Sequence, residues 1–140
     1  MKRTRLGPAL LATLLIPAGC MTVVVRPRVL TDAYRDSPVP ADHVTVVRTL
    51  PLDSVPEACV RVAALQGSGQ QDFSDASELM AEMRKEAGKA GANVVAILSW
   101  EEAGRRERAL DVFLRTGVDR DALGLALRCP PETAEALARR

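Results

Sequence analysis

Cysteine thiols are the groups in this chain best suited to covalent chemistry, and Cys20 is the most informative of the three. It ends the run 14–20, in which two small residues stand directly before the thiol. Upstream lie three basic residues within 2–5 and a short, mostly apolar stretch at 6–18. A charged start, a short apolar region and small residues before a cleavage point are the parts of a secretory signal peptide. We therefore predict that residues 1–19 are removed and that Cys20 becomes the new N-terminus.

The run 14–20 resembles the lipobox of bacterial lipoproteins. This resemblance implies that the Cys20 thiol carries diacylglycerol, and that a third acyl chain such as palmitate joins the new amino group. Each buried methylene contributes about 0.8 kcal/mol, so two or three chains would form a stable membrane anchor. Met21, rather than aspartate, follows the cysteine, which by the same resemblance implies an outer-membrane protein facing the periplasm. An ordinary cleaved signal and a short membrane anchor are the alternatives, although a membrane span needs about 20 apolar residues.

Composition points to one small domain without affinity for nucleic acid. Residues 20–140 comprise 121 residues, with 16 basic and 18 acidic side chains, so the processed chain is slightly acidic. Such a balance gives no electrostatic footprint for a polyanion. The length suits a single domain with a tether. Aromatic residues are scarce, so the core must consist mainly of valine, leucine, isoleucine and alanine.

The two remaining cysteines, Cys59 and Cys129, leave two alternatives open. In an oxidising periplasm they can form a disulfide. Closing a loop of roughly 70 residues would stabilise the fold by about 4 kcal/mol in the chain-entropy model. The other alternative is two separately buried thiols, because spacing alone does not show that the two Cα atoms come close enough.

Apolar periodicity predicts one amphipathic helix and several strands. The helix is carried by residues that recur with helical spacing, and Gly91 is suited to end it; these residues are Ala76, Leu79, Met80, Met83, Ala87 and Ala90. The run 94–98 is continuously apolar, as in a strand buried on both faces. Further strands are expected at 44–49, 58–65 and 123–129.

Less regular segments separate these elements. Loops are expected at 67–71 and 117–121, and 109–115 favours a strand over a helix. The expected organisation is a signal peptide at 1–19, a lipidated cysteine with a proline-rich tether at 20–42, a domain at 43–130, and a tail or short helix at 131–140. Residues 22–25 could instead pack on the domain as an edge strand. The fold class is α+β, with a small mixed sheet of four to five strands, one main helix and a βαβ unit; an antiparallel placement of its strands stays open.

The stretch from the helix into the buried strand is similar to a known pattern. Met83, Ala87, the triplet 91–93, Val95 and Ser99 form the run MRxxAxxxGANxVxxxS. This run resembles small envelope lipoproteins, among them the outer-membrane sensor of the Rcs stress phosphorelay. The resemblance covers about residues 57–101 and implies an α/β fold and an envelope location. That sensor has a cysteine directly after the serine, whereas Trp100 stands there in this chain.

Patterns typical of catalysis or of metal binding are weak. His43 is the only histidine, it stands at a proline-rich boundary, and no Gly-x-Ser-x-Gly elbow accompanies it. A zinc site from Cys59, Cys129 and His43 would lack paired Cys-x-x-Cys spacing. We therefore expect no cofactor, no metal and no enzymatic activity. The glycines at 67–69 lack the spacing of a phosphate-binding loop.

Two functional classes agree with these observations. The first is a membrane-anchored envelope lipoprotein that acts as a non-enzymatic protein-interaction or sensing module, with lipid on Cys20 and an envelope protein as its partner. The alternative is a periplasmic lipoprotein that binds a small ligand or a metal ion. A pocket lined by Cys59 and His43 would indicate this second class.

Overall fold

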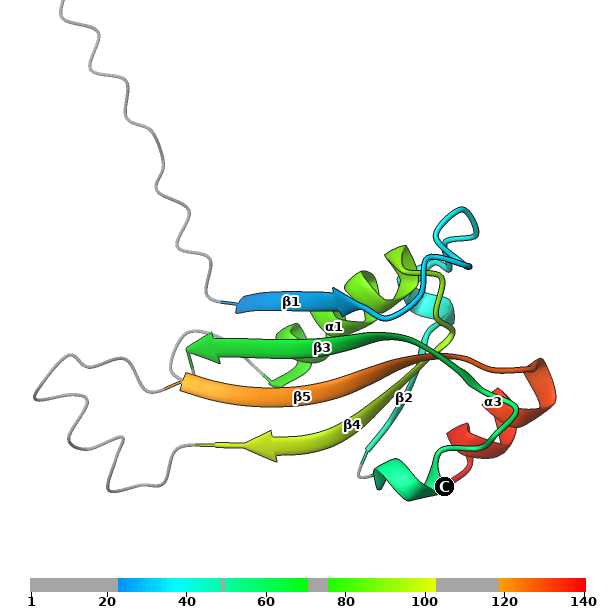
Figure 1. Cartoon of the computed structure of the whole chain (residues 1–140). Coiled ribbons are helices and arrows are strands. Elements are labelled where there is room, and N and C mark those ends of the chain that lie inside the picture. The colour runs from blue at the N-terminus through cyan, green and yellow to red at the C-terminus, as the bar shows by residue number, and fades with distance from the viewer. Residues whose placement is uncertain (1–22, 49, 71–75, 103–118) are drawn as a thin grey trace, which may run out of the picture.

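The computed structural model describes residues 23–48, 50–70, 76–102 and 119–140. They form a five-stranded sheet (Figure 1). A long helix covers one face of the sheet, and a short helix lies at one end of the opposite face. The strands are β1 (Val23–Val29), β2 (Thr45–Val47), β3 (Val60–Gln70), β4 (Val94–Glu101) and β5 (Asp119–Arg128). The helices are α1 (Ala76–Lys89) and α3 (Pro131–Ala138), with 3-10 turns η1 (Ala41–His43) and η2 (Leu52–Ser54).

The sheet is mixed, with strand order β1-β3-β5-β4-β2. β5 lies at its centre and is antiparallel to both β3 and β4, while β1 pairs antiparallel with β3 and β2 pairs parallel with β4. Because β3 and β4 both oppose β5, they run in the same direction with α1 between them in the chain. The predicted α+β class with one main helix is confirmed, and its βαβ unit is split by β5.

The stripe of apolar residues on α1 packs against one face of the sheet. Leu79, Met83 and Ala87 are fully buried, as the helical spacing predicts. On the sheet they meet a continuous apolar layer made by Val62, Ala63, Leu65, Val95, Ile97, Ala122 and Ala126. Gly124 of β5 lies beneath α1, where an added Cβ would come within 2.6 Å of the Met83 Cε atom. This close approach is the reason that small residues of β5 face the helix.

A second apolar cluster lies on the opposite face, at the end of the sheet where α3 begins. It contains Val47, Leu50, Val94, Ala96, Leu125, Leu127 and Leu137, together with both cysteines. Cys59 and Cys129 are joined in a disulfide, with their Cα atoms 4.2 Å apart. The sequence left open either a disulfide or two separately buried thiols, and the structure contains the disulfide. Pro131 begins α3, a position where the missing proline N–H costs nothing.

The Gly-Ala-Asn triplet forms the turn between α1 and β4. Gly91 has φ +84°, and an added Cβ would lie 2.2 Å from the Tyr34 carbonyl oxygen. The Asn93 side chain makes two hydrogen bonds with the backbone of Cys129: its Nδ2 donates to the carbonyl oxygen at 2.8 Å, and its Oδ1 accepts from the N–H at 2.8 Å. The triplet thus ties the start of β4 to the end of β5 beside the disulfide. In this chain its role is structural.

Three segments differ from the simplest interpretation of the sequence. β1 lies within the stretch predicted as a tether, so the edge-strand alternative is the arrangement found at 23–29. The prediction of a loop at 67–71 is wrong for residues 67–70, because β3 continues through the glycines to Gln70. Gly67 has no side chain and so leaves room for the Leu79 side chain. The loop predicted at 117–121 is wrong from Asp119 onward, where β5 begins. Residues 109–115 lie outside the described residues.

Candidate functional site

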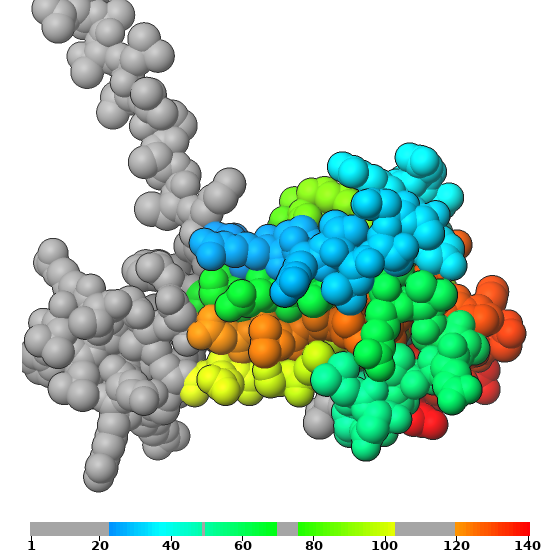
Figure 2. Space-filling view, in the orientation of Figure 1, coloured from blue at the N-terminus to red at the C-terminus, as the bar shows by residue number. Residues whose placement is uncertain are grey.

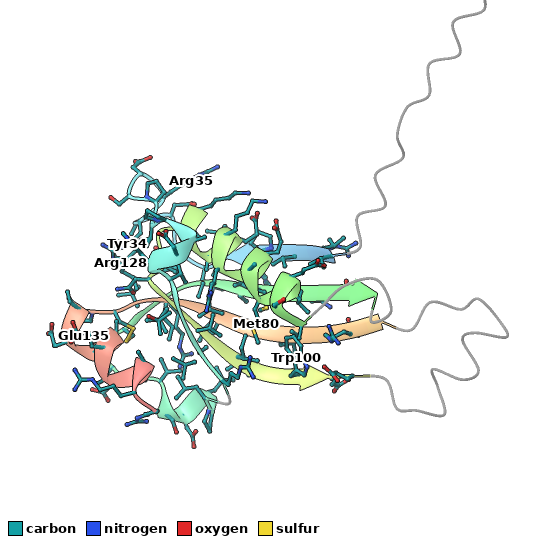
Figure 3. All side chains as sticks on the ribbon, turned by 180° about the vertical axis from the view of Figure 1, so that it is seen from behind. Tyr34, Arg35, Met80, Trp100, Arg128 and Glu135 are labelled. Carbon is teal, nitrogen blue, oxygen red and sulfur yellow. A yellow bond between two sulfur atoms is a disulfide. The ribbon has the colours of Figure 1, made fainter. Side chains whose placement is uncertain are left out.

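A cavity of about 300 Å³ opens where α1 begins, beside the ends of β2 and β4. Its lining is Arg48, Ala76, Met80, Ile97, Trp100 and Glu102. Figure 3 shows Met80 on α1 and Trp100 on β4 close together at this end of the helix. The volume lies at the lower end of the range for small-molecule sites, which are mostly apolar with a few polar groups.

One wall of the cavity is fixed by a three-residue polar cluster. The Trp100 indole Nε1 donates a hydrogen bond to Glu102 Oε1 at 3.1 Å, and Arg120 Nε lies 3.1 Å from the same oxygen. The Arg120 guanidinium also lies 5.7 Å from the centre of the Trp100 ring, within cation–π range. Arg120 is only 7% exposed, so its charge requires the partner that Glu102 supplies. The cluster fixes the orientation of the Trp100 ring.

Arg48 brings a second positive charge to the cavity. Its side chain is exposed, and no ion pair joins it to any residue within the described parts of the chain. Since Arg120 and Glu102 balance each other, the charge left at the cavity is that of Arg48. The site therefore combines an apolar surface with one available cation.

A shallower hollow of about 180 Å³ lies between the end of β1 and the last turn of α1. Its cations face acids of the same hollow: Arg35 lies 3.9 Å from Asp32, and Lys89 pairs with Glu86. The hydrogen bond with the Glu86 carboxylate raises the pKa of Lys89 above its usual range, which strengthens the pairing of the two groups. With its charges paired internally, this hollow is a weaker candidate than the α1 cavity.

The sheet face opposite α1 is the second surface of interest. Figure 2 shows this face, on which no described helix covers the ends of β3, β4 and β5 away from α3. Leu123 is 48% exposed near its middle, and Val24 is 38% exposed on β1. Two exposed arginines, Arg26 and Arg28, lie on the β1 side of this face, and two exposed acids, Glu101 and Asp121, lie on the β4 and β5 side. We call this area, with these six residues, the open sheet face.

The residues singled out in the sequence occupy different parts of the molecule. Cys20 lies outside the described residues. Cys59 and Cys129 lie in the cluster beneath α3, whereas His43 is exposed in η1, which contacts α1 on the other side of the sheet. Cys59 and His43 therefore lie on opposite sides of the sheet and do not line a common pocket. His43 Nε2 lies 3.8 Å from Asp42 Oδ2 in an exposed pair.

The described ranges contain neither a metal-binding cluster of side chains nor a membrane-spanning helix. No group of three or more histidine, cysteine, aspartate or glutamate side chains within 23–48, 50–70, 76–102 and 119–140 could hold a metal ion. No helix in these same ranges is long and apolar enough to span a bilayer.

The cavity cluster was missed because its members are distant in sequence. Arg120 stands in the stretch interpreted as a polar loop, while Glu102 stands at the start of a charged run. One signal was available: Arg120 continues the two-residue spacing of Ala122, Gly124 and Ala126, which puts it on the helix-facing side of β5. A charged residue on that side requires a buried partner.

Comparison with known proteins supports the fold. No protein-family model matches this chain, and no curated protein matches it. Among solved structures, the chain is similar to the crystal structure of the Francisella virulence factor FvfA. The identity is 14%, the TM-score is 0.54, and the match covers 74% of this chain and 96% of that one. At this level of identity, the likeness shows a shared fold.

Proposed function

We propose that this chain is a lipoprotein of the bacterial cell envelope, anchored in the outer membrane through lipid on Cys20, and that it acts as a non-enzymatic protein-interaction or sensing module. The observation that carries the proposal is the lipobox-like run that ends at Cys20. The disulfide between Cys59 and Cys129 supports an oxidising compartment, because such bridges persist in the periplasm and are rare in the cytosol.

The position of β1 fixes how the domain would sit on the membrane. β1 begins at Val23, three residues after Cys20. Three extended residues span about 10 Å, so the end of the sheet where β1 begins would lie next to the bilayer. In Figure 1, β3 and β4 end and β5 begins at this same end, while α3 lies at the far end. The far end, with the disulfide, would therefore face the periplasm.

The open sheet face is the surface best suited to a protein partner. It runs from the membrane-proximal end along the strands, so a neighbouring envelope protein can reach it from the side. Val24 on β1 and Leu123 on β5 offer apolar area, with the arginines along β1 and the acids on β4 and β5. Apolar anchors within a polar rim are typical of protein interfaces. A partner that places acidic residues opposite the β1 arginines and basic residues opposite Glu101 and Asp121 would be favoured over other proteins.

Site-specific photo-crosslinking in cells tests the interaction. A photoreactive residue at Leu123 should give one defined adduct with an envelope protein. The same residue at Arg84, which is exposed on the outer side of α1, should give none and serves as the matched control. If position 123 yields no adduct, or if both positions yield the same adducts, the open sheet face is not the interaction surface.

Loss of the thiol should release the protein from the membrane. We expect Cys20→Ser, exported with a signal peptide that is cleaved without lipidation in place of residues 1–19, to move nearly all of the chain from the membrane fraction to the soluble fraction, because the acyl chains supply the binding free energy. Fractionation of cells that express the two forms at equal levels measures this shift. Full retention of Cys20→Ser in the membrane fraction would count against a lipid anchor.

A second candidate function is the binding of a small ligand. The cavity beside Trp100 favours it, because the cavity joins an apolar lining to an available cation.

A further inference from the structure

We propose that the cavity at the start of α1 binds a small amphiphile with an apolar tail and a single carboxylate head, as in a short fatty acid. This inference goes beyond the interaction role and does not require the anchor. It rests on the lining residues, on the pairing of their charges and on the size of the cavity.

The apolar part of the ligand is specified by Met80, Ile97 and Trp100. Ile97 belongs to the buried core, and Met80 and Trp100 pack against that core while remaining partly accessible. A methionine adapts to the shape of an apolar ligand, since its side chain is unbranched and polarisable. The Trp100 ring offers a flat wall whose orientation is held by Glu102 and Arg120. This part of the site is prearranged, which lowers the cost of binding.

The charges around the cavity indicate the head group of the ligand, because one of them is paired within the described residues of the protein and the other is not. Glu102 accepts from Trp100 and pairs with Arg120, so its carboxylate is engaged and does not favour a cationic ligand. Arg48 lines the same cavity and has no ion pair within the described residues. A guanidinium binds a carboxylate through two parallel hydrogen bonds. The carboxylate of the ligand would therefore lie at Arg48, with the tail directed over Ile97 toward Trp100.

The volume limits the length of the tail. A cavity of about 300 Å³ lies at the lower bound for small-molecule sites, which suits one short chain rather than a two-chain phospholipid. Octanoate is the probe that matches this size and charge. Because it stays dissolved without forming micelles at low concentration, it can be added to the protein without detergent.

Fluorescence of Trp100 gives a direct readout, since it is the only tryptophan in the chain. The experiment uses the processed chain, residues 20–140, with Cys20→Ser and an intact disulfide, so that neither detergent nor the apolar stretch at 6–18 competes for the site. Titration with octanoate should change the Trp100 emission and saturate. Octylamine, which has the same tail and a positive head, should produce no saturable change.

Variants of exposed arginines separate specific binding from general attraction. Arg48→Ala should weaken octanoate binding by about tenfold or more, as expected for the loss of a charge-assisted hydrogen bond. Arg48→Lys should restore part of the affinity. Arg61→Ala, a change of another exposed arginine that lies outside the cavity lining, should leave binding unchanged.

The proposal is overturned if octanoate gives no saturable change, if octylamine binds equally well, or if Arg48→Ala and Arg61→Ala behave alike. Both arginines are exposed, so the variants should fold, and circular dichroism verifies this. None of these outcomes depends on lipidation or on a protein partner, so failure here is distinguishable from failure of the envelope role.

Discussion

Replacing Gly91 with alanine should lower the free energy of unfolding by about 3 kcal/mol or more. The backbone at Gly91 has φ +84°, and an L-residue held in a left-handed conformation costs about 1–2 kcal/mol. The new Cβ would also lie 2.2 Å from the Tyr34 carbonyl oxygen and 2.7 Å from the Tyr34 Cβ. The backbone near Tyr34 would have to move. That movement would disturb the contact between Tyr34 and Arg128 and the hydrogen bond from Arg128 to the Gly91 carbonyl.

Urea unfolding followed by circular dichroism measures this loss. Gly67→Ala is the comparison variant, because its Cβ would meet side chains rather than backbone, with Leu79 Cδ1 at 2.7 Å and Val25 Cγ2 at 3.5 Å. We expect that comparison variant to lose about 1–2 kcal/mol, less than Gly91→Ala, because Leu79 is buried and must repack around the new Cβ while the backbone stays in place. Equal losses at the two positions would contradict the role assigned to the Gly91 turn.

Removal of the disulfide should have the second large effect, a loss of about 4 kcal/mol. The bridge joins cysteines 70 residues apart, and closing a loop of that length restricts the unfolded chain by about this amount. The double variant Cys59→Ala/Cys129→Ala removes the bridge while keeping the positions apolar, which suits their burial at 8% and 4% exposure. Urea unfolding of the two proteins measures the difference.

Reduction provides the control for this second prediction. Dithiothreitol should destabilise the wild-type chain by a similar amount and leave the double variant unchanged. A difference of less than about 1 kcal/mol between wild type and double variant would show that the bridge contributes little. Because α3 begins two residues after Cys129 and η2 ends five residues before Cys59, we also expect α3 and η2 to be the first elements to lose hydrogen-exchange protection when the bridge is absent.

The sequence predicts most of the fold where one pattern repeats over several turns or residues. The helical spacing of Leu79, Met83 and Ala87 and the apolar run at 94–98 both led to the elements found. β1 is different, because Pro27 and the neighbouring arginines are typical of a tether. Edge strands tolerate proline and charge, since one side of their backbone faces solvent. The pattern therefore could not decide between the two alternatives.

The candidate site was less accessible to prediction, because tertiary packing creates it. The residues of the site come from four separate places: Arg48 directly follows β2, Met80 lies in α1, Trp100 in β4 and Arg120 in β5. No short motif contains them. The charge of Arg120 suggested a loop, whereas the ion pair with Glu102 allows it to be buried within β5. The spacing of residues along the sequence does not show which distant charged side chains form ion pairs.

The most direct test of the proposed envelope role is the intact mass of the protein extracted from membranes. We expect the mass of residues 20–140 increased by diacylglycerol, with a further acyl group in bacteria that add one. The Cys20→Ser form should lack this increase. A mass that corresponds to the full unprocessed chain, or to a cleaved chain without acyl groups, would contradict anchoring at Cys20.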